Sequence, residues 1–200
     1  RRLFAADAPF WASAPSDGFS SHHVARDDPG PLGGLVRALA YAALASAPGV
    51  AASTSAEVWA HRRDNDGAHQ LHYDLDEVAL RSSGEARSPI ASSVFYLETI
   101  DGDRGAPTLV IDRRLGDADD AAATAWRCAP KENRLLTFDG RLLHCVCPAP
   151  VPRAPPGRQR VTVMVGWWAE DVSVSPADAP GPNRARGPHA RAWGDDEFVP

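Results

Sequence analysis

The sequence predicts a mainly β domain, built as a sandwich or a barrel, and three observations favour this fold class. Seven short runs of strand-like composition follow one another between residues 57 and 169, with little helical pattern between them. Turn-forming residues separate several of these runs, at residues 64–67, 101–105 and 139–140. A single stretch has the spacing of an amphipathic helix. The short connections favour antiparallel pairing of the strands.

The N-terminal part, residues 1–52, is predicted to be an irregular segment followed by a helix. Residues 1–31 mix Pro, Gly, Ser and Asp with scattered aromatic side chains. The helix covers residues 32–47, where apolar residues recur at helical spacing until Pro48 ends the run. We expect this helix to pack on the outside of the β domain.

The β domain is predicted to span residues 53–170. Residues 117–129, between its fourth and fifth strands, are expected to form a loop or a short helix. Residues 171–200 return to Pro, Ala, Gly, Asp and Arg, which predicts a mostly irregular tail. The seven predicted strands cover residues 57–63, 68–74, 91–98, 107–112, 134–138, 142–147 and 160–169.

Composition and charge exclude some classes of partner. The formal net charge is -5 and the pI is about 5.8, so no strongly basic face is expected and a nucleic acid partner is not implied. No apolar run is long enough to span a membrane. Three cysteines, an odd number, favour a reducing compartment, and the cytoplasm is our expectation. The sequence begins with Arg1-Arg2, so a targeting segment upstream of it would not be visible.

His72 and Asp74 are the first candidate metal ligands. They stand two residues apart in a predicted strand, so both side chains point to the same face and can hold one ion. The alternative is an ordinary polar pair on a surface strand. Asp76 and Glu77 are rival carboxylates, although Asp76 would need a bent strand to reach the same ion. His69, three residues before His72, is expected on the opposite face of the strand.

His144 is the second candidate histidine, in an apolar strand that follows a predicted hairpin. A buried core histidine with one hydrogen bond is the alternative interpretation. If His144 converges with His72 and Asp74, two histidines and one carboxylate leave three coordination positions open. Such a ligand set is typical of non-haem Fe(II) oxygenases rather than of closed structural zinc sites. Cys145 and Cys147 flank His144, and we expect them to be core residues, with a redox or zinc role as the alternative.

Arg160 and Thr162 share a face of the last predicted strand. An oxo-diacid cosubstrate needs a buried cation for its distal carboxylate, and the planar guanidinium of arginine suits this task because it can bind a carboxylate with two hydrogen bonds. Thr162 can donate a further hydrogen bond to the same group. The alternative is that the arginines close a polar loop at the start of the strand.

The order of these motifs between Trp59 and Trp168 resembles the Fe(II)/2-oxoglutarate-dependent dioxygenase superfamily, and within it the prolyl 4-hydroxylase-like branch. This resemblance implies a double-stranded β-helix, a jelly-roll barrel like that of cupins. It also implies that His72, Asp74 and His144 bind iron and act in catalysis, and that Arg160 anchors the C5 carboxylate of 2-oxoglutarate. The motif residues are His72-Tyr73-Asp74, Ser93 to Leu97, Gly105 to Leu109, Asn133 to Phe138, His144, Arg160 and Thr162.

Tyr96 matches a strand tyrosine that hydrogen-bonds the same carboxylate in such proteins; packing in the strand is the alternative. The interval between His144 and Arg160 is longer than is usual in the superfamily, which makes Arg158 a rival for the anchor.

The resemblance implies a reaction in which O2 and 2-oxoglutarate are consumed and an unidentified substrate is hydroxylated, for example a peptidyl residue such as proline. Fe(II) and 2-oxoglutarate are the expected cofactor and cosubstrate, with ascorbate as a further reductant. The substrate is expected to be a peptide or a small molecule. Two alternatives remain open: a cupin-like metal enzyme that does not use 2-oxoglutarate, and a non-catalytic β-barrel used for binding.

Overall fold

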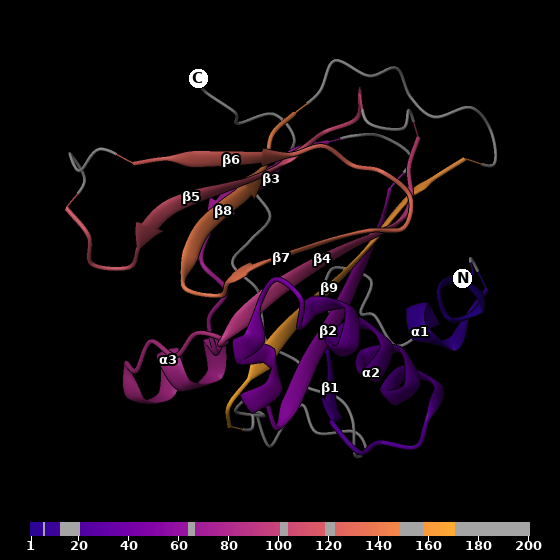
Figure 1. The fold of residues 1–200 in the computed structure, drawn as a ribbon, viewed down its shortest axis with the longest axis horizontal. Helices are drawn as coiled ribbons and strands as arrows, with labels where there is room; N and C mark the ends of the chain where they lie inside the picture. The colour runs from indigo at the N-terminus through magenta and orange to yellow at the C-terminus, as the bar shows by residue number, and fades with distance from the viewer. Residues whose placement is uncertain are drawn as a thin grey trace.

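The structure is a computed structural model that describes residues 1–5, 7–12, 21–63, 67–100, 104–118, 123–148 and 158–170. The predicted tail at residues 171–200 lies outside this part of the chain, as do residues 64–66 and 101–103 of the predicted turns. In the described part, consecutive elements build two antiparallel β-sheets (Figure 1), so the prediction of a mainly β domain is confirmed.

The large sheet has the strand order β1-β2-β9-β4-β7, and the small sheet has the order β3-β8-β5-β6. Except for the β5–β6 pair, each strand after β2 lies in the sheet opposite its predecessor, which is the alternation of a double-stranded β-helix. The predicted jelly-roll class is therefore confirmed. The strands are β1 His22–Ala25, β2 Ser55–Arg63, β3 His69–His72, β4 Ala91–Glu98, β5 Thr108–Arg114, β6 Ala125–Cys128, β7 Arg134–Asp139, β8 Leu142–Val146 and β9 Arg160–Trp168.

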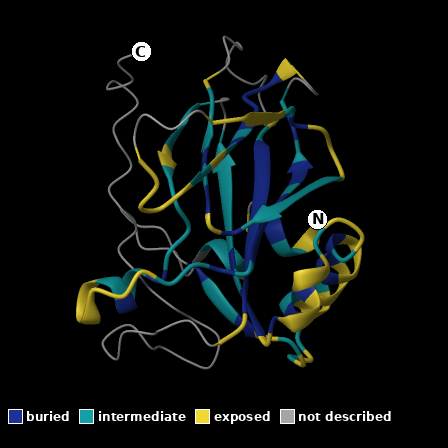
Figure 2. Ribbon diagram, turned by 60° about the vertical axis from the view of Figure 1, so that its left-hand side comes forward, coloured by how far each residue is buried: buried dark blue, intermediate teal, exposed yellow. Residues whose placement is uncertain are grey.

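The helix α2, Pro31–Ala43, covers the outer face of the large sheet, as predicted. Pro31 occupies its first turn, where a missing N–H costs no hydrogen bond, and the helix ends four residues earlier than expected. Its buried residues pack against the odd-numbered residues of β9, while the even-numbered residues of β9 face the space between the sheets. Figure 2 shows buried residues along these central strands. The apolar cluster includes Val36, Leu39, Val58, Val163, Val165 and Trp167.

Several short elements were not expected from the sequence. The strand β6 forms where a loop or short helix was predicted, so that prediction was wrong. It has only four residues, the first three of them exposed, which is too short a run for its pattern to indicate a strand. The strand β1 adds an edge to the large sheet. The helix α3, Glu77–Ser83, begins at Asp76, whose carboxylate accepts a hydrogen bond from the Ala79 N–H, and ends at Gly84 with a positive φ.

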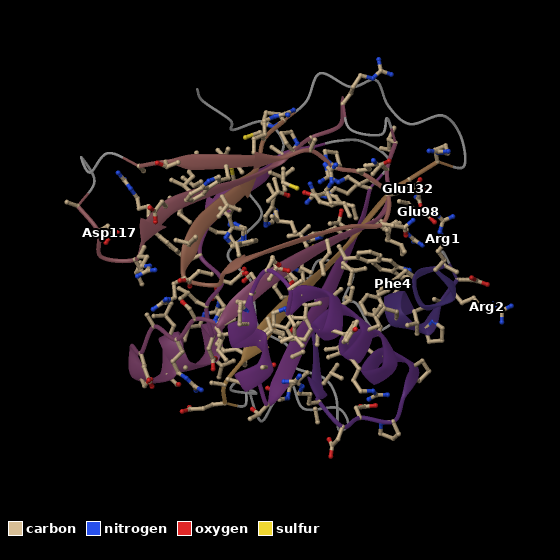
Figure 3. All side chains as sticks on the ribbon, in the orientation of Figure 1. Arg1, Arg2, Phe4, Glu98, Asp117 and Glu132 are labelled. Atoms are coloured by element: carbon tan, nitrogen blue, oxygen red, sulfur yellow. The ribbon has the colours of Figure 1, made fainter. Side chains whose placement is uncertain are left out.

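The first residues of the chain form the 3₁₀-helix η1, Arg2–Phe4, and the short helix α1, Pro9–Ala12. A second 3₁₀-helix, η2 Pro48–Ala52, precedes β2. Arg1 forms an ion pair of 3.0 Å with Glu132, just before β7 (Figure 3). Within the described residues, every helix is too short or too polar to span a lipid bilayer.

Candidate metal centre

The candidate ligands come from two strands of the small sheet. His72 is the last residue of β3, and its cross-strand partner in β8 is His144. Asp74 follows β3 by two residues, in the short segment between β3 and α3. The convergence expected from the sequence is therefore present, although the strand ends before Asp74. His144 is buried, with 7% of its surface exposed.

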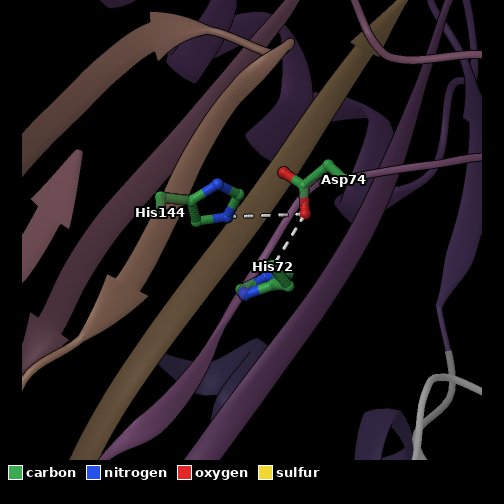
Figure 4. Close-up of side chains that lie close together, drawn as sticks. All are labelled: His72, Asp74 and His144. Atoms are coloured by element: carbon green, nitrogen blue, oxygen red, sulfur yellow. Dashed lines mark ion pairs between the residues drawn. The ribbon is translucent and has the colours of Figure 1, made fainter. Parts of the chain in front are cut away.

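Three donor atoms face one point between these residues (Figure 4). The Nε2 atoms of His72 and His144 each lie 3.6 Å from Oδ1 of Asp74, and all three donors lie within 4.8 Å of one another. The centre of the triangle that these three atoms form, the point equidistant from them, lies at most about 2.4 Å from each of them. This distance is close to the roughly 2.0–2.2 Å of histidine and carboxylate bonds to a divalent transition metal. A contraction of a few tenths of an ångström would complete three ligand bonds.

Hydrogen bonds hold all three side chains in this orientation. Nδ1 of His72 lies 2.8 Å from the carbonyl oxygen of Gln70, and Nδ1 of His144 lies 3.0 Å from that of Leu142. Because a carbonyl can only accept, both hydrogens reside on Nδ1, and both Nε2 lone pairs are directed at the ion position. Ser92 of β4 donates to Oδ2 of Asp74 at 2.6 Å, which leaves Oδ1 for the ion.

The electrostatics of the site favour a neutral imidazole at His72. Burial lowers the pKa of His72 below its ordinary value, and the neighbouring His144 lowers it further, while Asp74 opposes the shift. A metal binds only the deprotonated imidazole nitrogen, so this environment keeps the ring in the form that an ion requires.

Arg160 lines the same cavity as the three donor residues. Its side chain is buried, with 5% of its surface exposed, and its Nε donates to Oγ1 of Thr162 at 3.3 Å. Arg158, the rival anchor, is exposed and donates to the carbonyl of Thr99 at 3.0 Å. Between the two arginines, burial in the cavity therefore favours Arg160.

Tyr96 is fully buried between the two sheets, on the same face of β4 as the cavity-lining Val94. Its hydroxyl is 2.6 Å from Oγ1 of Thr108, which does line the cavity, and it donates to the carbonyl of Cys128 at 3.4 Å. Burial raises the pKa of Tyr96 to about 12. The guanidinium of Arg160 lies 6.0 Å from the centroid of the Tyr96 ring, so the tyrosine packs beside the predicted anchor.

The rival carboxylates are engaged elsewhere. Asp76 is buried, caps the N-terminus of α3 and forms an ion pair of 3.4 Å with Arg87. Glu77 pairs with Arg81 one turn along α3, at 2.7 Å. Neither belongs to the group of converging donors, which within the described residues consists of His72, Asp74 and His144.

The expectation for His69 was wrong, because its side chain faces the same cavity as His72. In β3 three residue steps separate His69 from His72, whereas two steps separate their partners Val146 and His144 in β8. The extra residue is a β-bulge, which brings His69 back to the inner face. Its ring centroid lies 4.8 Å from that of His72, and burial lowers the pKa of His69 to about 3.

Cys145 and Cys147 are half-buried free thiols whose sulfur atoms lie 4.0 Å apart. Burial raises the pKa of Cys145 to about 12, which disfavours the thiolate needed for metal binding. Several other residues at the site had not been identified from the sequence. Among them are Ser92, whose role depends on the approach of the two sheets, and the inward-facing β2 residues Trp59, His61 and Arg63.

The fold and the site together define a double-stranded β-helix with a candidate centre of two histidines and one carboxylate. No protein-family model matches the chain, and no curated protein matches it either. Similar solved structures include a prolyl 4-hydroxylase from Pseudomonas putida, which is 17% identical over 73% of this chain and 70% of that chain, with a TM-score of 0.44.

Two further solved structures extend this comparison. The non-haem α-ketoglutarate-dependent epimerase SnoN of nogalamycin biosynthesis is 13% identical over 89% of this chain and 76% of that chain, with a TM-score of 0.44. A cupin domain of an XRE-family transcriptional regulator from Enterobacter cloacae is 9% identical over 56% of this chain and 81% of that chain, with a TM-score of 0.28. Similarity at these identities concerns the fold, so the function has to be argued from the site.

Proposed function

We propose that this protein is a non-haem Fe(II) and 2-oxoglutarate-dependent oxygenase that hydroxylates its substrate. The observation that supports the proposal is the convergence of His72, Asp74 and His144 on one ion position, in a cavity that also contains the buried Arg160. Two histidines and one carboxylate leave half of an octahedral coordination sphere open, as chelation of an oxo-acid together with O2 requires.

The residues of the cavity have distinct tasks in this proposal. His72, Asp74 and His144 hold Fe(II), which when bound with 2-oxoglutarate supplies the oxidising chemistry as the diacid is decarboxylated to succinate. Arg160 binds the distal carboxylate of 2-oxoglutarate, and Thr162 orients the guanidinium. Val94 and Met164 line the cavity with apolar surface, which limits the entry of water.

The buried Arg160 also favours the oxygenase over its alternatives. A cupin-like enzyme that does not use a diacid has no need of a guanidinium buried beside the metal position. A binding barrel without catalysis has no need of three converging donor atoms. The family resemblance leaves two predicted classes of substrate, a peptidyl residue such as proline and a small molecule, and ascorbate stays our prediction for the additional reductant.

The experiment that tests the proposal measures succinate formed from 2-oxoglutarate with Fe(II), ascorbate and O2. Anaerobic absorbance titration measures binding of Fe(II) and 2-oxoglutarate independently of turnover. We expect His72→Ala to abolish both the formation of succinate and the absorbance change on titration with Fe(II) and 2-oxoglutarate. Arg160→Gln should weaken 2-oxoglutarate binding by about 100-fold, because a charge-assisted bidentate contact contributes roughly 3 kcal/mol. The matched control is Arg158→Gln, which removes a nearby arginine outside the cavity and should leave the affinity unchanged.

Two outcomes would contradict the proposal. Failure of wild-type protein to bind Fe(II) anaerobically would refute the metal centre. Normal Fe(II) binding without any affinity for 2-oxoglutarate would favour the cupin-like alternative.

A further inference from the structure

A groove separates the edge strands β6 and β7 on the side of the barrel away from β3. Both strands are edges of their sheets and do not pair with each other, so among the described residues no strand-to-strand backbone ladder closes the barrel here. The groove is lined mainly by apolar side chains, and its charged members are Arg127, Arg134 and Asp139. The apolar members include Val110, Trp126, Leu136, Phe138 and Leu142.

One cross-strand row of residues connects this groove to the candidate metal centre. Trp126 pairs with Val110, Val110 pairs with His144, and His144 pairs with His72. Residues in register on adjacent strands point to the same face, so Trp126 faces inward like the two histidines. Two strand spacings separate Trp126 from His144, which is about 10 Å between their backbones.

Phe138 forms the boundary between the two spaces. It lines both the groove and the metal cavity, and its ring meets that of His144 edge-on, with centroids 5.0 Å apart. A molecule lying in the groove against Trp126 therefore has its inner end directed over Val110 toward the metal position. Trp126 keeps 51% of its surface exposed although it faces inward, so its ring is accessible for stacking.

The charges in the groove favour an anionic ligand. Asp139, the carboxylate among the described lining residues, is already paired with Arg141 at 2.6 Å and with Arg114 at 3.1 Å. Arg134 is half-buried and donates one hydrogen bond, to the carbonyl of Ala129 at 2.6 Å. A guanidinium has five N–H donors, so Arg134 retains capacity to bind an anion.

We propose that the groove between β6 and β7 binds the substrate, and that this substrate combines a flat apolar part, stacked on Trp126, with an anionic group bound by Arg134. The inference rests on the proposed function, because the metal position at the inner end of the groove is where the reaction would occur. The class of substrate is thus an aromatic or similarly flat organic acid.

The first test measures binding of the probe 4-fluorophenylacetate by ligand-detected saturation transfer NMR on the metal-free protein. We expect Trp126→Ala to lower the affinity at least fivefold and Trp126→Phe to retain most of it. The matched control is Leu71→Ala, because Leu71 of β3 is similarly exposed, at 53%, and should not affect binding. The neutral analogue 4-fluorophenylacetamide should bind more weakly to wild type, and Arg134→Gln should remove this difference.

The second test measures the distance of the bound probe from the ion position. With Mn(II) in place of Fe(II), the fluorine signal of the bound probe should broaden strongly, because only two strand spacings, about 10 Å, separate Trp126 from the metal ligand His144 and unpaired electrons relax nuclei so close to them. Absence of saturation transfer to wild type at millimolar probe, or equal affinity in Trp126→Ala, would overturn the proposal. Binding without broadening in Mn(II)-loaded protein would also overturn it. If Mn(II) itself fails to bind, the metal function is refuted, whereas the first test still decides whether the groove binds such acids.

Discussion

His72 and His144 are direct cross-strand neighbours whose ring centroids lie 4.2 Å apart, and each holds its Nδ1 near the carbonyl of the residue two positions earlier in its own chain segment. The two rings are therefore oriented by the same local contact, made once in β3 and once in β8. This repeated contact fixes both tautomers without help from any other side chain.

His144→Ala should lower the affinity for Fe(II) or Mn(II) by more than 100-fold, because one of three protein ligands is removed. The control is His69→Ala, which alters a histidine of the same cavity outside the converging donors. It should change the affinity less than threefold. Isothermal titration of both variants with Mn(II) checks the difference, and equal losses in the two variants would argue against the assigned donor set.

Ser92→Ala should weaken metal binding by about 10- to 100-fold, because the carboxylate of Asp74 loses the hydrogen bond that orients it. Ser93→Ala is the control, since Ser93 is the next residue in β4 and bonds to Thr137 and Trp167 instead. Circular dichroism verifies that both variants fold. An unchanged affinity in Ser92→Ala would show that Asp74 is positioned by the backbone alone.

Metal binding should resist acid better than an ordinary histidine site does. The folded protein lowers the pKa of His72 from its ordinary value of 6.5, so protons compete with the metal only as the pH falls below this lowered pKa. Above pH 6.5 the affinity should therefore vary little with pH. Absorbance titrations with Co(II) from pH 8 to pH 5 measure this dependence, and a midpoint above 6.5 would contradict the lowered pKa.

Glu57→Gln should stabilise the protein at neutral pH. Burial raises the pKa of Glu57 from 4.5 to about 7, so between these values the folded state holds a proton that the unfolded state has lost. Stability then decreases as the pH rises from 4.5 to 7, and the loss is complete above the folded pKa. Above pH 7 the variant should be more stable by about 3 kcal/mol, and near pH 4 the difference should disappear. Urea unfolding at both pH values measures this change.

The two central strands β4 and β9, which are buried on both faces, could be predicted from the sequence almost to the residue. Ala91–Glu98 has the predicted bounds, and the last strand begins at Arg160 as expected. Their side chains are buried, so most of their residues are apolar or small, and such a run can be recognised in the sequence. The strand Ala125–Cys128 lacks that pattern, because its inward face borders an open groove instead of a core. This strand forms because it pairs with β5, and the residues of the strand itself contain no pattern that indicates this pairing.

Spacing in a strand relates His72 to Asp74, whereas the convergence of His144 with them was expected from the family resemblance, and all three converge in the structure. The inward position of His69 could not be predicted, since it depends on a bulge that is defined only by the pairing with β8. Ser92 was also missed. A serine in a strand is ordinary in any sequence, and it gains its role at the site because β4 of the other sheet passes within hydrogen-bond distance of Asp74.

The hydrogen bond from Ser92 to Asp74 also affects how the two sheets are held together. Asp74 follows the last residue of β3 in the small sheet and Ser92 belongs to the large sheet, so this hydrogen bond is one of the side-chain contacts that join the two sheets, like that between Tyr96 and Thr108. The affinity for an ion bound by Asp74 would then depend on the distance between the two sheets. We therefore expect a substitution in the core under α2, such as Val165→Ala, to weaken metal binding although it changes none of the three metal ligands.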